Sequence, residues 1–291
     1  MNKMLETRKR DYADRIEAYL ARCFSDNVPQ KRLLESMRYS LLAGGKRLRP
    51  MLTLAFCELL GGDSEKALPF AAAIEMVHTY SLIHDDLPCM DNDDYRRGRP
   101  TNHKIYGEAG AVLAGDALLT AAFGQLASAA LPAERIVRAV AALSECAGEL
   151  GMVGGQVLDM EAEHCLCTEQ AVYDIQSRKT GALIAAACRL GVCAAGGTSA
   201  QEHSAAEYAA ALGLAFQIED DILDVAGDAQ KLGKATGMDG TKKNTFVRLY
   251  GIERCREMIE SQTQRALAAL KDYENAEFLS ELALSLKSRE T

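Results

Sequence analysis

Apolar residues recur at three- and four-residue spacing along almost the whole chain, which is the period of one face of an α-helix. Alanine and leucine are abundant, proline occurs only six times, and little in the pattern indicates strands. The pattern therefore predicts a chain of helices, at approximately 4–25, 30–43, 48–60, 66–87, 109–130, 133–150, 169–193, 202–226, 246–270 and 275–288.

The breaks between these helices carry glycine or proline, as at Gly44-Gly45, Leu131-Pro132 and Gly196-Gly197. No stretch rich in proline, serine or charge divides the chain. We therefore expect an all-α fold, a single large helical bundle that forms one domain over residues 1–291.

Composition narrows the class of protein. Hydrophobic residues make up 48% and charged residues 25% of the chain, which is ordinary for a soluble globular protein. A net charge of −8 argues against a nucleic-acid partner, because such proteins carry a basic face. No stretch has the length of uncharged apolar residues that a membrane span needs, so we expect no stable membrane insertion.

Two further features of the sequence indicate the cellular compartment of the protein. Residues 1–20 alternate charged and apolar positions and lack the apolar core and cleavage site of a signal peptide. The nine cysteines are scattered and contain no CxxC pair of the kind that binds zinc. Reduced thiols in a cytoplasmic protein fit this pattern best.

An acidic stretch stands out directly after the apolar segment 74–83. Five carboxylates fall within ten residues, from Asp85 to Asp94, and three arginines follow at once. Neighbouring carboxylates repel one another unless a cation lies among them, and hard oxygen ligands suit Mg²⁺. Guanidinium groups beside such a metal would bind a phosphate or diphosphate. A solvated acidic loop is the alternative, but the preceding helix has the pattern of a buried one.

The helix that leads into this stretch carries further candidates. His78 shares a helical stripe with Asp85, so we expect it to face the ligand. Pro88 cannot donate to the helical ladder, and the chain should unwind near it. Unwinding would let Asp91 approach Asp85 and Asp86.

A second acidic group lies inside an apolar helix. Gln217, Asp220, Asp221 and Asp224 follow the spacing i, i+3, i+4, i+7 and form a polar stripe. Buried carboxylates need partners. Two acidic clusters on separate helices can face each other across a bundle and hold several divalent ions.

Three basic residues are further candidates for ligand binding, and one apolar segment is a candidate for a buried helix or a subunit contact. Lys46 and Arg49 follow Gly44-Gly45, although basic residues at a helix end are usually solvated. Lys179 precedes an apolar helix of small residues and could point into a cavity. The segment 109–130 is nearly free of charge, which is typical of a buried helix or of a subunit contact.

Together these motifs resemble those of the short-chain trans-prenyl diphosphate synthases. The resemblance rests on Asp85-Asp86-x₄-Asp91 with Arg96-Arg97, and on Asp220-Asp221-x₂-Asp224. It implies an all-α bundle of the isoprenoid synthase type around a deep central cavity, a homodimer, and three Mg²⁺ ions per active site.

The resemblance also implies roles for individual residues. The Mg²⁺ ligands would be Asp85, Asp86, Asp91, Asp220, Asp221 and Asp224. Isopentenyl diphosphate would contact Lys46, Arg49, His78 and Arg97, and the allylic diphosphate would contact Arg96, Lys179, Lys234 and Lys243. The oxygens of Thr180 and Gln217 would face the developing cation. Glu219 departs from the family pattern and could alter metal affinity.

The implied reaction condenses isopentenyl diphosphate with dimethylallyl or geranyl diphosphate. Tyr80 lies five residues before Asp85, about 7.5 Å lower along an ideal helix, where a bulky ring would stop the growing chain. The resemblance implies the fifteen-carbon product, farnesyl diphosphate, because in the family a large residue near this position, or the four-residue spacing within the first motif, accompanies that product. The stretch from His84 to Asp91 also resembles that of geranylgeranyl-forming relatives, so a twenty-carbon product stays open.

Other classes explain less of the sequence. A metal-dependent phosphohydrolase would use a histidine-aspartate pair such as His84-Asp85, but the chain has only five histidines and repeats the pair nowhere. A non-catalytic synthase subunit usually lacks one acidic motif, and this chain has both. A terpene cyclase would lack the second Asp-Asp-x-x-Asp and the pair Lys46 and Arg49.

Overall fold

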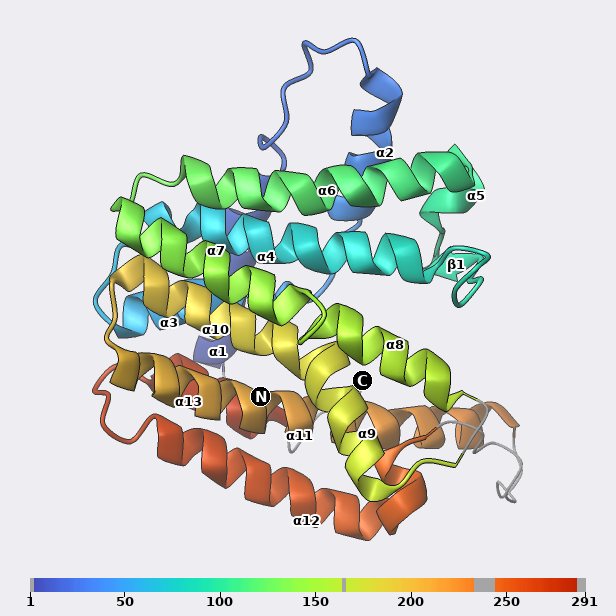
Figure 1. Cartoon of the computed structure of the whole chain (residues 1–291). Helices are drawn as coiled ribbons and strands as arrows, with labels where there is room; N and C mark the ends of the chain where they lie inside the picture. The colour runs from blue at the N-terminus through green and yellow to red at the C-terminus, as the bar shows by residue number, and fades with distance from the viewer. Residues whose placement is uncertain (1–2, 164–165, 233–243, 287–291) are drawn as a thin grey trace. The chain divides into compact units, whose positions relative to one another are not determined.

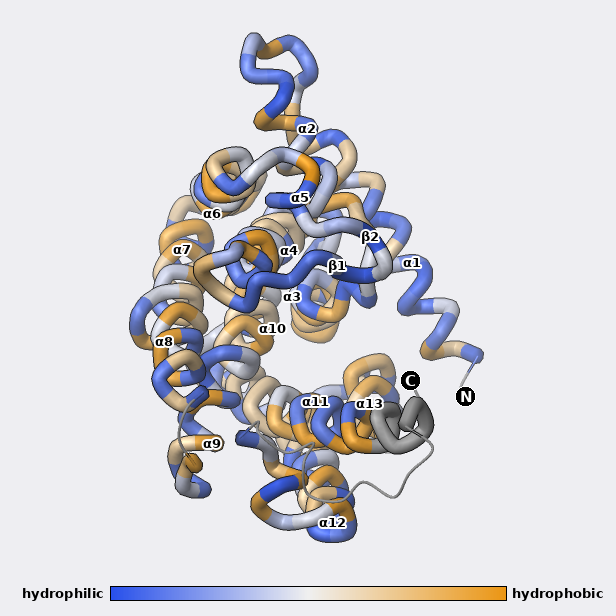
Figure 2. The backbone as a smooth tube through the Cα atoms, turned by 90° about the vertical axis from the view of Figure 1, so that its right-hand side faces the viewer, coloured by the Kyte–Doolittle hydropathy of each residue, from blue (hydrophilic) through white to orange (hydrophobic). Residues whose placement is uncertain are grey.

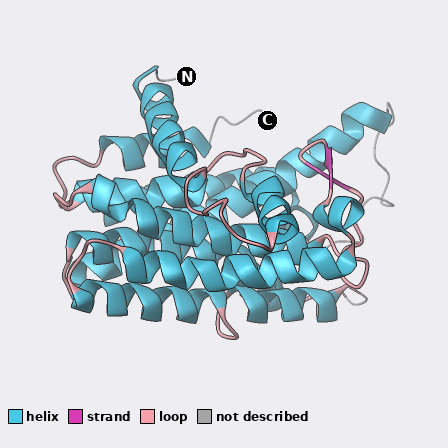
Figure 3. Ribbon diagram, turned by 90° about the horizontal axis from the view of Figure 1, so that it is seen from above, coloured by secondary structure: helices cyan, strands magenta, loops and turns pink. Residues whose placement is uncertain are grey.

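The computed structural model describes residues 3–163, 166–232 and 244–286, with side-chain detail up to residue 225 of the middle range, and it divides into two compact units. Unit 1 comprises Met1–Leu5, Ala142–Arg189 and Gly197–Thr291, and unit 2 comprises Glu6–Ala141 and Leu190–Gly196. Regular structure in the described ranges is helical apart from one short hairpin (Figure 3). The predicted all-α fold is thereby confirmed, whereas a single domain stays a prediction.

Figure 1 colours the elements along the chain. The elements that lie wholly or mostly in unit 2 are α1 (Lys3–Leu20), α2 (Lys31–Leu41), α3 (Leu48–Leu59), α4 (Ser64–Asp85), β1 (Tyr95–Arg96), β2 (Arg99–Pro100), α5 (Asn102–Tyr106), α6 (Glu108–Ser128) and α7 (Ala133–Ala147). Those wholly or mostly in unit 1 are α8 (Met152–Ala162), α9 (Glu169–Gln176), the π-helical turn η1 (Ser177–Gly181), α10 (Ala182–Ala195), α11 (Ser199–Leu232), α12 (Phe246–Ala269) and α13 (Glu277–Ser285).

The predicted helices are present, with three differences. Helix α1 ends at Leu20 instead of residue 25, because the following Ser25, Asp26 and Asn27 favour turns. The predicted helix 169–193 contains the π-helical turn η1 between α9 and α10. Helix α5 and the hairpin were not predicted because they are too short to show a period. Helix α8 was not predicted either, and it contains the pair Gly154-Gly155, which disfavours a helix.

Helix α4 is the centre of unit 2. It is buried around most of its circumference and packs against α3 and, most extensively, against α6, which lies beside it (Figure 1). The buried side of α6 carries small residues, among them Ala111, Ala114 and Gly115. Small side chains let the two helix backbones approach closely, which fixes the end of α4 that carries the first acidic motif.

Helix α6 has a second, open face. Val112 is 40% and Leu113 is 58% exposed, so the apolar character of α6 exceeds what its packing in unit 2 uses. Among the described residues, α6 alone is long and apolar enough to cross a membrane by length and composition. Helix α6 packs on α4, α2 and α5, and a third of its apolar window is buried (33%).

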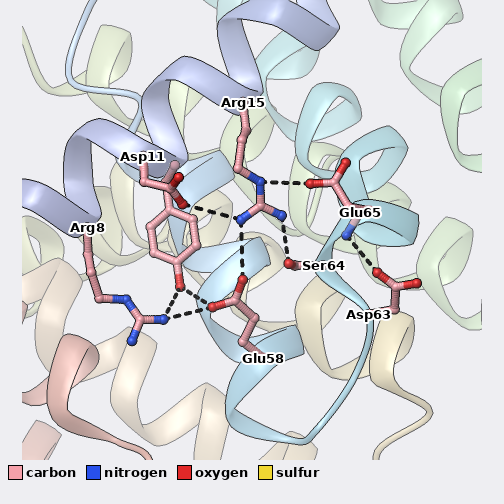
Figure 4. Close-up of polar contacts among 8 residues, drawn as sticks. Arg8, Asp11, Arg15, Glu58, Asp63, Ser64 and Glu65 are labelled. Carbon is pink, nitrogen blue, oxygen red and sulfur yellow. Dashed lines mark hydrogen bonds and ion pairs between the residues drawn. The ribbon is translucent and has the colours of Figure 1, made fainter.

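A polar network anchors α1 to the end of α3 and the start of α4 (Figure 4). The Glu58 carboxylate accepts hydrogen bonds from the Tyr12 hydroxyl at 2.6 Å and from Arg8 Nη2 at 2.8 Å. Arg15 donates to Glu58 at 3.4 Å and to Glu65 at 2.9 Å. Burial and the Glu58 carboxylate raise the pKa of Tyr12, so its hydroxyl stays protonated as a donor.

A buried ion pair fixes the loop between α2 and α3. Arg47 lies at the start of α3 with a left-handed backbone (φ 47°) and is 3% exposed. Its guanidinium donates to Glu75 of α4 at 2.5 Å, to Glu17 of α1 at 2.7 Å and to the Leu41 carbonyl at 2.8 Å. Three helices therefore meet at one cation.

We expect the Glu75→Gln variant to lose about 3 kcal/mol of unfolding free energy, because removing one partner leaves the buried Arg47 charge poorly compensated. The exposed pair Lys66–Asp63 provides the control, since each side chain is more than half exposed. Lys66→Gln should change stability by no more than about 0.5 kcal/mol. Urea unfolding followed by circular dichroism measures both, and equal midpoints for the two variants would contradict the role of the Arg47 pair.

Candidate active site

The first acidic motif lies where α4 ends and the chain turns back. Helix α4 ends at Asp85, three residues before Pro88. The Asp91 amide then donates to the Asp85 carbonyl at 2.9 Å, which brings the two residues together. The predicted unwinding near Pro88 is confirmed.

Asp86 differs from its neighbours because it is 3% exposed. Arg96 on β1 binds both of its carboxylate oxygens: Nε lies 2.7 Å from Oδ1 and 3.0 Å from Oδ2, and Nη2 lies 2.6 Å from Oδ1. Burial raises the pKa of Asp86, and the Arg96 contact partly offsets this shift. The structure thus joins a predicted metal ligand to a predicted substrate ligand.

The hairpin β1–β2 presents the arginines of the motif, and Figure 2 shows its hydrophilic strand β1. Arg96 pairs with Arg99, and the two residues between them, Arg97 and Gly98, both have positive φ (53° and 73°). Two left-handed residues form the tight turn that matches the twist of a hairpin. The turn directs Arg97 to the loop before α3, where its Nη1 donates to the Gly44 carbonyl.

Glycine is required where the two segments meet. A β-carbon on Gly45 would lie 2.8 Å from Arg97 Cζ and 2.9 Å from Nη1, and Gly45 has φ +131°. The Gly44-Gly45 pair therefore makes room for the Arg97 guanidinium beside the basic loop.

A cluster of positive charge surrounds this loop. Burial, and then the charges of Arg49 and Arg97, hold the pKa of His78 well below its ordinary value, so His78 is neutral at neutral pH. Burial likewise lowers the pKa of Arg49, and Arg97 adds to the shift. Within the described ranges the buried Arg49 Nε has no hydrogen-bond partner. Such an orphaned donor among cations is suited to an anionic ligand.

The structure therefore groups three of the four residues predicted to bind isopentenyl diphosphate, namely Arg49, His78 and Arg97. Lys46 is exposed on the same loop. Beside the hairpin lies an open pocket whose lining includes Thr79, Asp86, Arg96, Arg97 and Arg99.

Residues that the sequence did not indicate hold the hairpin. Asn102 is buried, and its Nδ2 donates to the Ser36 carbonyl and the Ser40 hydroxyl, each at 2.9 Å. The Tyr39 hydroxyl donates to the Pro100 carbonyl at 2.7 Å. These contacts join α2 to the segment after β2, and no local period could reveal them because the partners lie more than 60 residues apart.

The second acidic motif repeats the division seen in the first. Asp221 is 5% exposed; its Oδ2 accepts from the Phe246 amide at 2.8 Å and its Oδ1 accepts from Gln217 Nε2 at 3.2 Å. Asp220 is partly buried and Asp224 is exposed. Burial, with smaller contributions from the charges of Asp224 and Asp220, raises the pKa of Asp221 to about 6.

The π-helical turn η1 carries two predicted catalytic residues. Thr180 donates its hydroxyl to Gln217 Oε1 at 3.2 Å, which joins η1 to α11. Lys179 Nζ lies 2.5 Å from Asp159 Oδ2 on α8. A β-carbon on Gly155 would lie 2.7 Å from Lys179 Cα, so only glycine permits this approach of α8. Single π turns inside helices occur frequently at functional sites.

Of the remaining predicted residues, two fall outside the described ranges and two are buried. Lys234 and Lys243 lie outside the described residues. Glu219 is buried, and Tyr80 is 7% exposed with its ring against His84. No group of three or more metal-ligating side chains converges among the described residues.

The acidic residues nevertheless suit magnesium. Asp85, Asp91, Asp220 and Asp224 offer oxygen ligands that are at least partly exposed. Mg²⁺ is commonly held by one or two carboxylates together with substrate phosphates and water, so it needs no complete protein cage. These residues fit an ion that binds with its substrate.

Comparison with known proteins decides the family. The sequence pattern of the family described as polyprenyl synthetase matches residues 30–283. The chain belongs to the polyprenyl synthetase family. Among curated members, it is 48% identical over 247 residues to the chloroplastic geranylgeranyl pyrophosphate synthase of Catharanthus roseus, covering 84% of this chain and 69% of that protein.

Other members give a consistent result. The dimethylallyltranstransferase of Fischerella ambigua (strain UTEX 1903) is 46% identical over 265 residues, or 90% of this chain and 76% of that protein. The crystal structure of an FPP/GFPP synthase from Zymomonas mobilis shares 37% identity and a TM-score of 0.88 over 97% of this chain and 98% of that one. The geranyltransferase of Legionella pneumophila has a TM-score of 0.88 at 34% identity, over 99% of this chain and 98% of that one. This polyprenyl synthetase is a prenyltransferase with the all-α isoprenoid synthase fold.

Because the pKa of Asp221 is raised, the unfolding free energy of the protein should depend on pH. The folded state binds this proton with a pKa of about 6, against 3.8 for the ordinary group. The folded state therefore binds more protons than the unfolded state between these values, and the unfolding free energy falls as pH rises from about 4 to 6.

We expect wild type to lose roughly 2–3 kcal/mol relative to Asp221→Asn across that window, as a shift of about two units implies. Urea unfolding in EDTA at a series of pH values measures the difference. Parallel curves for the two proteins would show that Asp221 titrates as an ordinary carboxylate.

Proposed function

We propose that the protein is a farnesyl diphosphate synthase, which joins isopentenyl diphosphate to dimethylallyl and then geranyl diphosphate and releases diphosphate. The basic cluster around Arg49 carries this proposal. Its orphaned buried donor and neutral His78 suit a diphosphate group, and they are side chains other than the Arg96–Asp86 pair, which suits a second one. A prenyl synthase uses two diphosphate substrates, whereas a terpene cyclase or a phosphohydrolase uses one.

The basic residues divide between the two substrates. Arg49 and Arg97 hold the diphosphate of isopentenyl diphosphate, neutral His78 donates a hydrogen bond to it, and Lys46 supports them from the loop. Arg96 and Lys179 bind the allylic diphosphate, with Lys234 and Lys243 as further proposed ligands.

Mg²⁺ ions are proposed to bind the diphosphate groups together with these basic residues. Asp85, Asp91, Asp220 and Asp224 are the proposed ligands of Mg²⁺, with three ions per active site. Held by these residues, Mg²⁺ would supply positive charge that neutralises the leaving diphosphate. Asp86 directs Arg96 toward that same group, and Asp221 fixes Gln217.

The polar chain from Asp221 to Thr180 gives Gln217 its orientation. Because Gln217 donates its Nε2 to Asp221, its Oε1 faces the Thr180 hydroxyl. The oxygens of these two residues stabilise the developing allylic cation. The double bond of isopentenyl diphosphate attacks the cation, and the released diphosphate takes the proton that is lost.

The product length follows from Tyr80. Its buried ring, one turn and a half before Asp85, favours a fifteen-carbon product. A twenty-carbon product is the second candidate, because several relatives at 46–48% identity are named geranylgeranyl pyrophosphate synthases.

The open apolar face of α6 supports a further proposal. A second copy of the chain covers Val112 and Leu113, so that the protein is a homodimer. The scattered cysteines favour the cytoplasm as its compartment. One relative from Arabidopsis thaliana, 45% identical, is named as the large subunit of a heterodimeric synthase, which supports a subunit contact here.

The first test incubates the protein with Mg²⁺, dimethylallyl diphosphate and labelled isopentenyl diphosphate and separates the dephosphorylated products by length. We expect a dominant C15 alcohol. Asp85→Ala and Asp220→Ala should each lower turnover at least 10³-fold, since each removes a ligand of the metal-bound leaving group. Asp272→Ala, an exposed aspartate on the surface, serves as the matched control.

The outcomes separate the candidates. A dominant C20 alcohol would replace the farnesyl product with the geranylgeranyl one. Diphosphate release without condensation would favour a hydrolase, and full activity in either aspartate variant would refute the role of that motif.

The second test concerns the α6 face. We expect wild type to elute as a dimer in size-exclusion chromatography with light scattering, and Leu113→Asp to elute as a monomer, because a charge would be buried without a partner. Leu166→Asp places the same change at another exposed leucine and should remain dimeric. A monomeric wild type would contradict the proposed contact.

A further inference from the structure

The end of α4 is held against α6 by the ring of His84. Nε2 of this ring lies 3.1 Å from the Val112 carbonyl of α6. A β-carbon added to Gly115 would lie 2.5 Å from His84 Cδ2 and 2.8 Å from Cε1. The imidazole therefore rests directly on the Gly115 backbone, in space that any side chain would take.

The same ring contacts Tyr80 one helical turn earlier. The two ring centroids lie 5.7 Å apart, with the planes at 76°, which is the edge-to-face arrangement favoured by aromatic pairs. Tyr80 is 7% exposed. Its ring is therefore bounded by a neighbour that is itself fixed to α6.

We propose that His84 and Gly115 set the length of the prenyl product by fixing the position of the Tyr80 ring. The inference rests on the proposed synthase function and extends it to two residues that the motifs did not assign. His84 and Gly115 are positioning residues, because they act through Tyr80 and need not touch the product.

The contact among Tyr80, His84 and Gly115 restricts how the Tyr80 ring can move. A tyrosine ring changes place by rotating about its χ1 bond between a few allowed rotamers. The His84 ring stands in the way of that movement on one side, and its contacts with the Gly115 backbone and the Val112 carbonyl hold it there. Removing the imidazole leaves a void beside the Tyr80 ring, into which the ring can turn and make room for one more isoprene unit.

His84 also directly precedes Asp85, so its loss lowers turnover through the proposed metal ligand. Turnover and product length separate these two effects. A displaced Asp85 changes the rate of every condensation, whereas a displaced Tyr80 changes the ratio of products.

The test measures the ratio of the next longer product to the main wild-type product in wild type, His84→Ala, Tyr80→Ala and the double variant. We expect His84→Ala to raise this ratio at least fivefold. The double variant should match Tyr80→Ala, because His84 has no ring left to position.

A pair of glycine variants on α6 gives an independent measurement. Gly115→Ala should displace His84 and raise the same ratio. Gly124→Ala is the matched control: it makes the same change in the same helix, and its β-carbon would meet no atom within 4 Å. It should leave the product ratio unchanged and remain folded, and thermal unfolding of both variants monitors this.

Several results would overturn the inference. Condensation with an unchanged product ratio in His84→Ala would do so, and this result would leave the synthase function intact. If His84→Ala raised the product ratio by the same factor in the Tyr80→Ala variant as in wild type, His84 would act without Tyr80. No condensation by wild type would instead refute the proposed function, and the inference with it.

Discussion

The burial of one carboxylate in each acidic motif is the constraint on which both motifs depend. A buried carboxylate is costly unless protein groups satisfy it. Arg96 satisfies Asp86, while the Phe246 amide and Gln217 satisfy Asp221. These partners are not incidental, because Arg96 and Gln217 are themselves predicted to act on substrate. Each buried carboxylate thus orients a neighbouring side chain that is proposed to act on substrate.

This division assigns different work to aspartates that are adjacent in sequence. In both motifs the second residue of the Asp-Asp pair is buried and bound by protein, whereas the last aspartate is exposed. The exposed residues remain accessible to an ion that arrives with a diphosphate. The arginines of the basic cluster divide in the same way. Arg47 is bound by the carboxylates of Glu75 and Glu17, whereas the buried Nε of Arg49 has no hydrogen-bond partner among the described residues.

Local patterns in the sequence predicted what depends on local chemistry. Periodicity predicted the long helices, and Pro88 predicted the turn that joins Asp91 to Asp85. Contacts across long separations were not predictable in this way. Arg47 looked like one more basic residue of its loop, although it binds carboxylates 28 and 30 residues away.

The partners within the motifs show the same limit. Both Asp86 and Asp221 fit the spacing of metal ligands, and spacing alone could not reveal that Arg96 and the Phe246 amide already bind them. A crystal structure with Mg²⁺ and an unreactive thio analogue of dimethylallyl diphosphate tests this most directly. We expect Asp85 and Asp91 at about 2.1 Å from an ion while Asp86 keeps Arg96 and Asp221 keeps the Phe246 amide. Direct coordination of an ion by Asp86 or Asp221, with loss of those partners, would contradict the account.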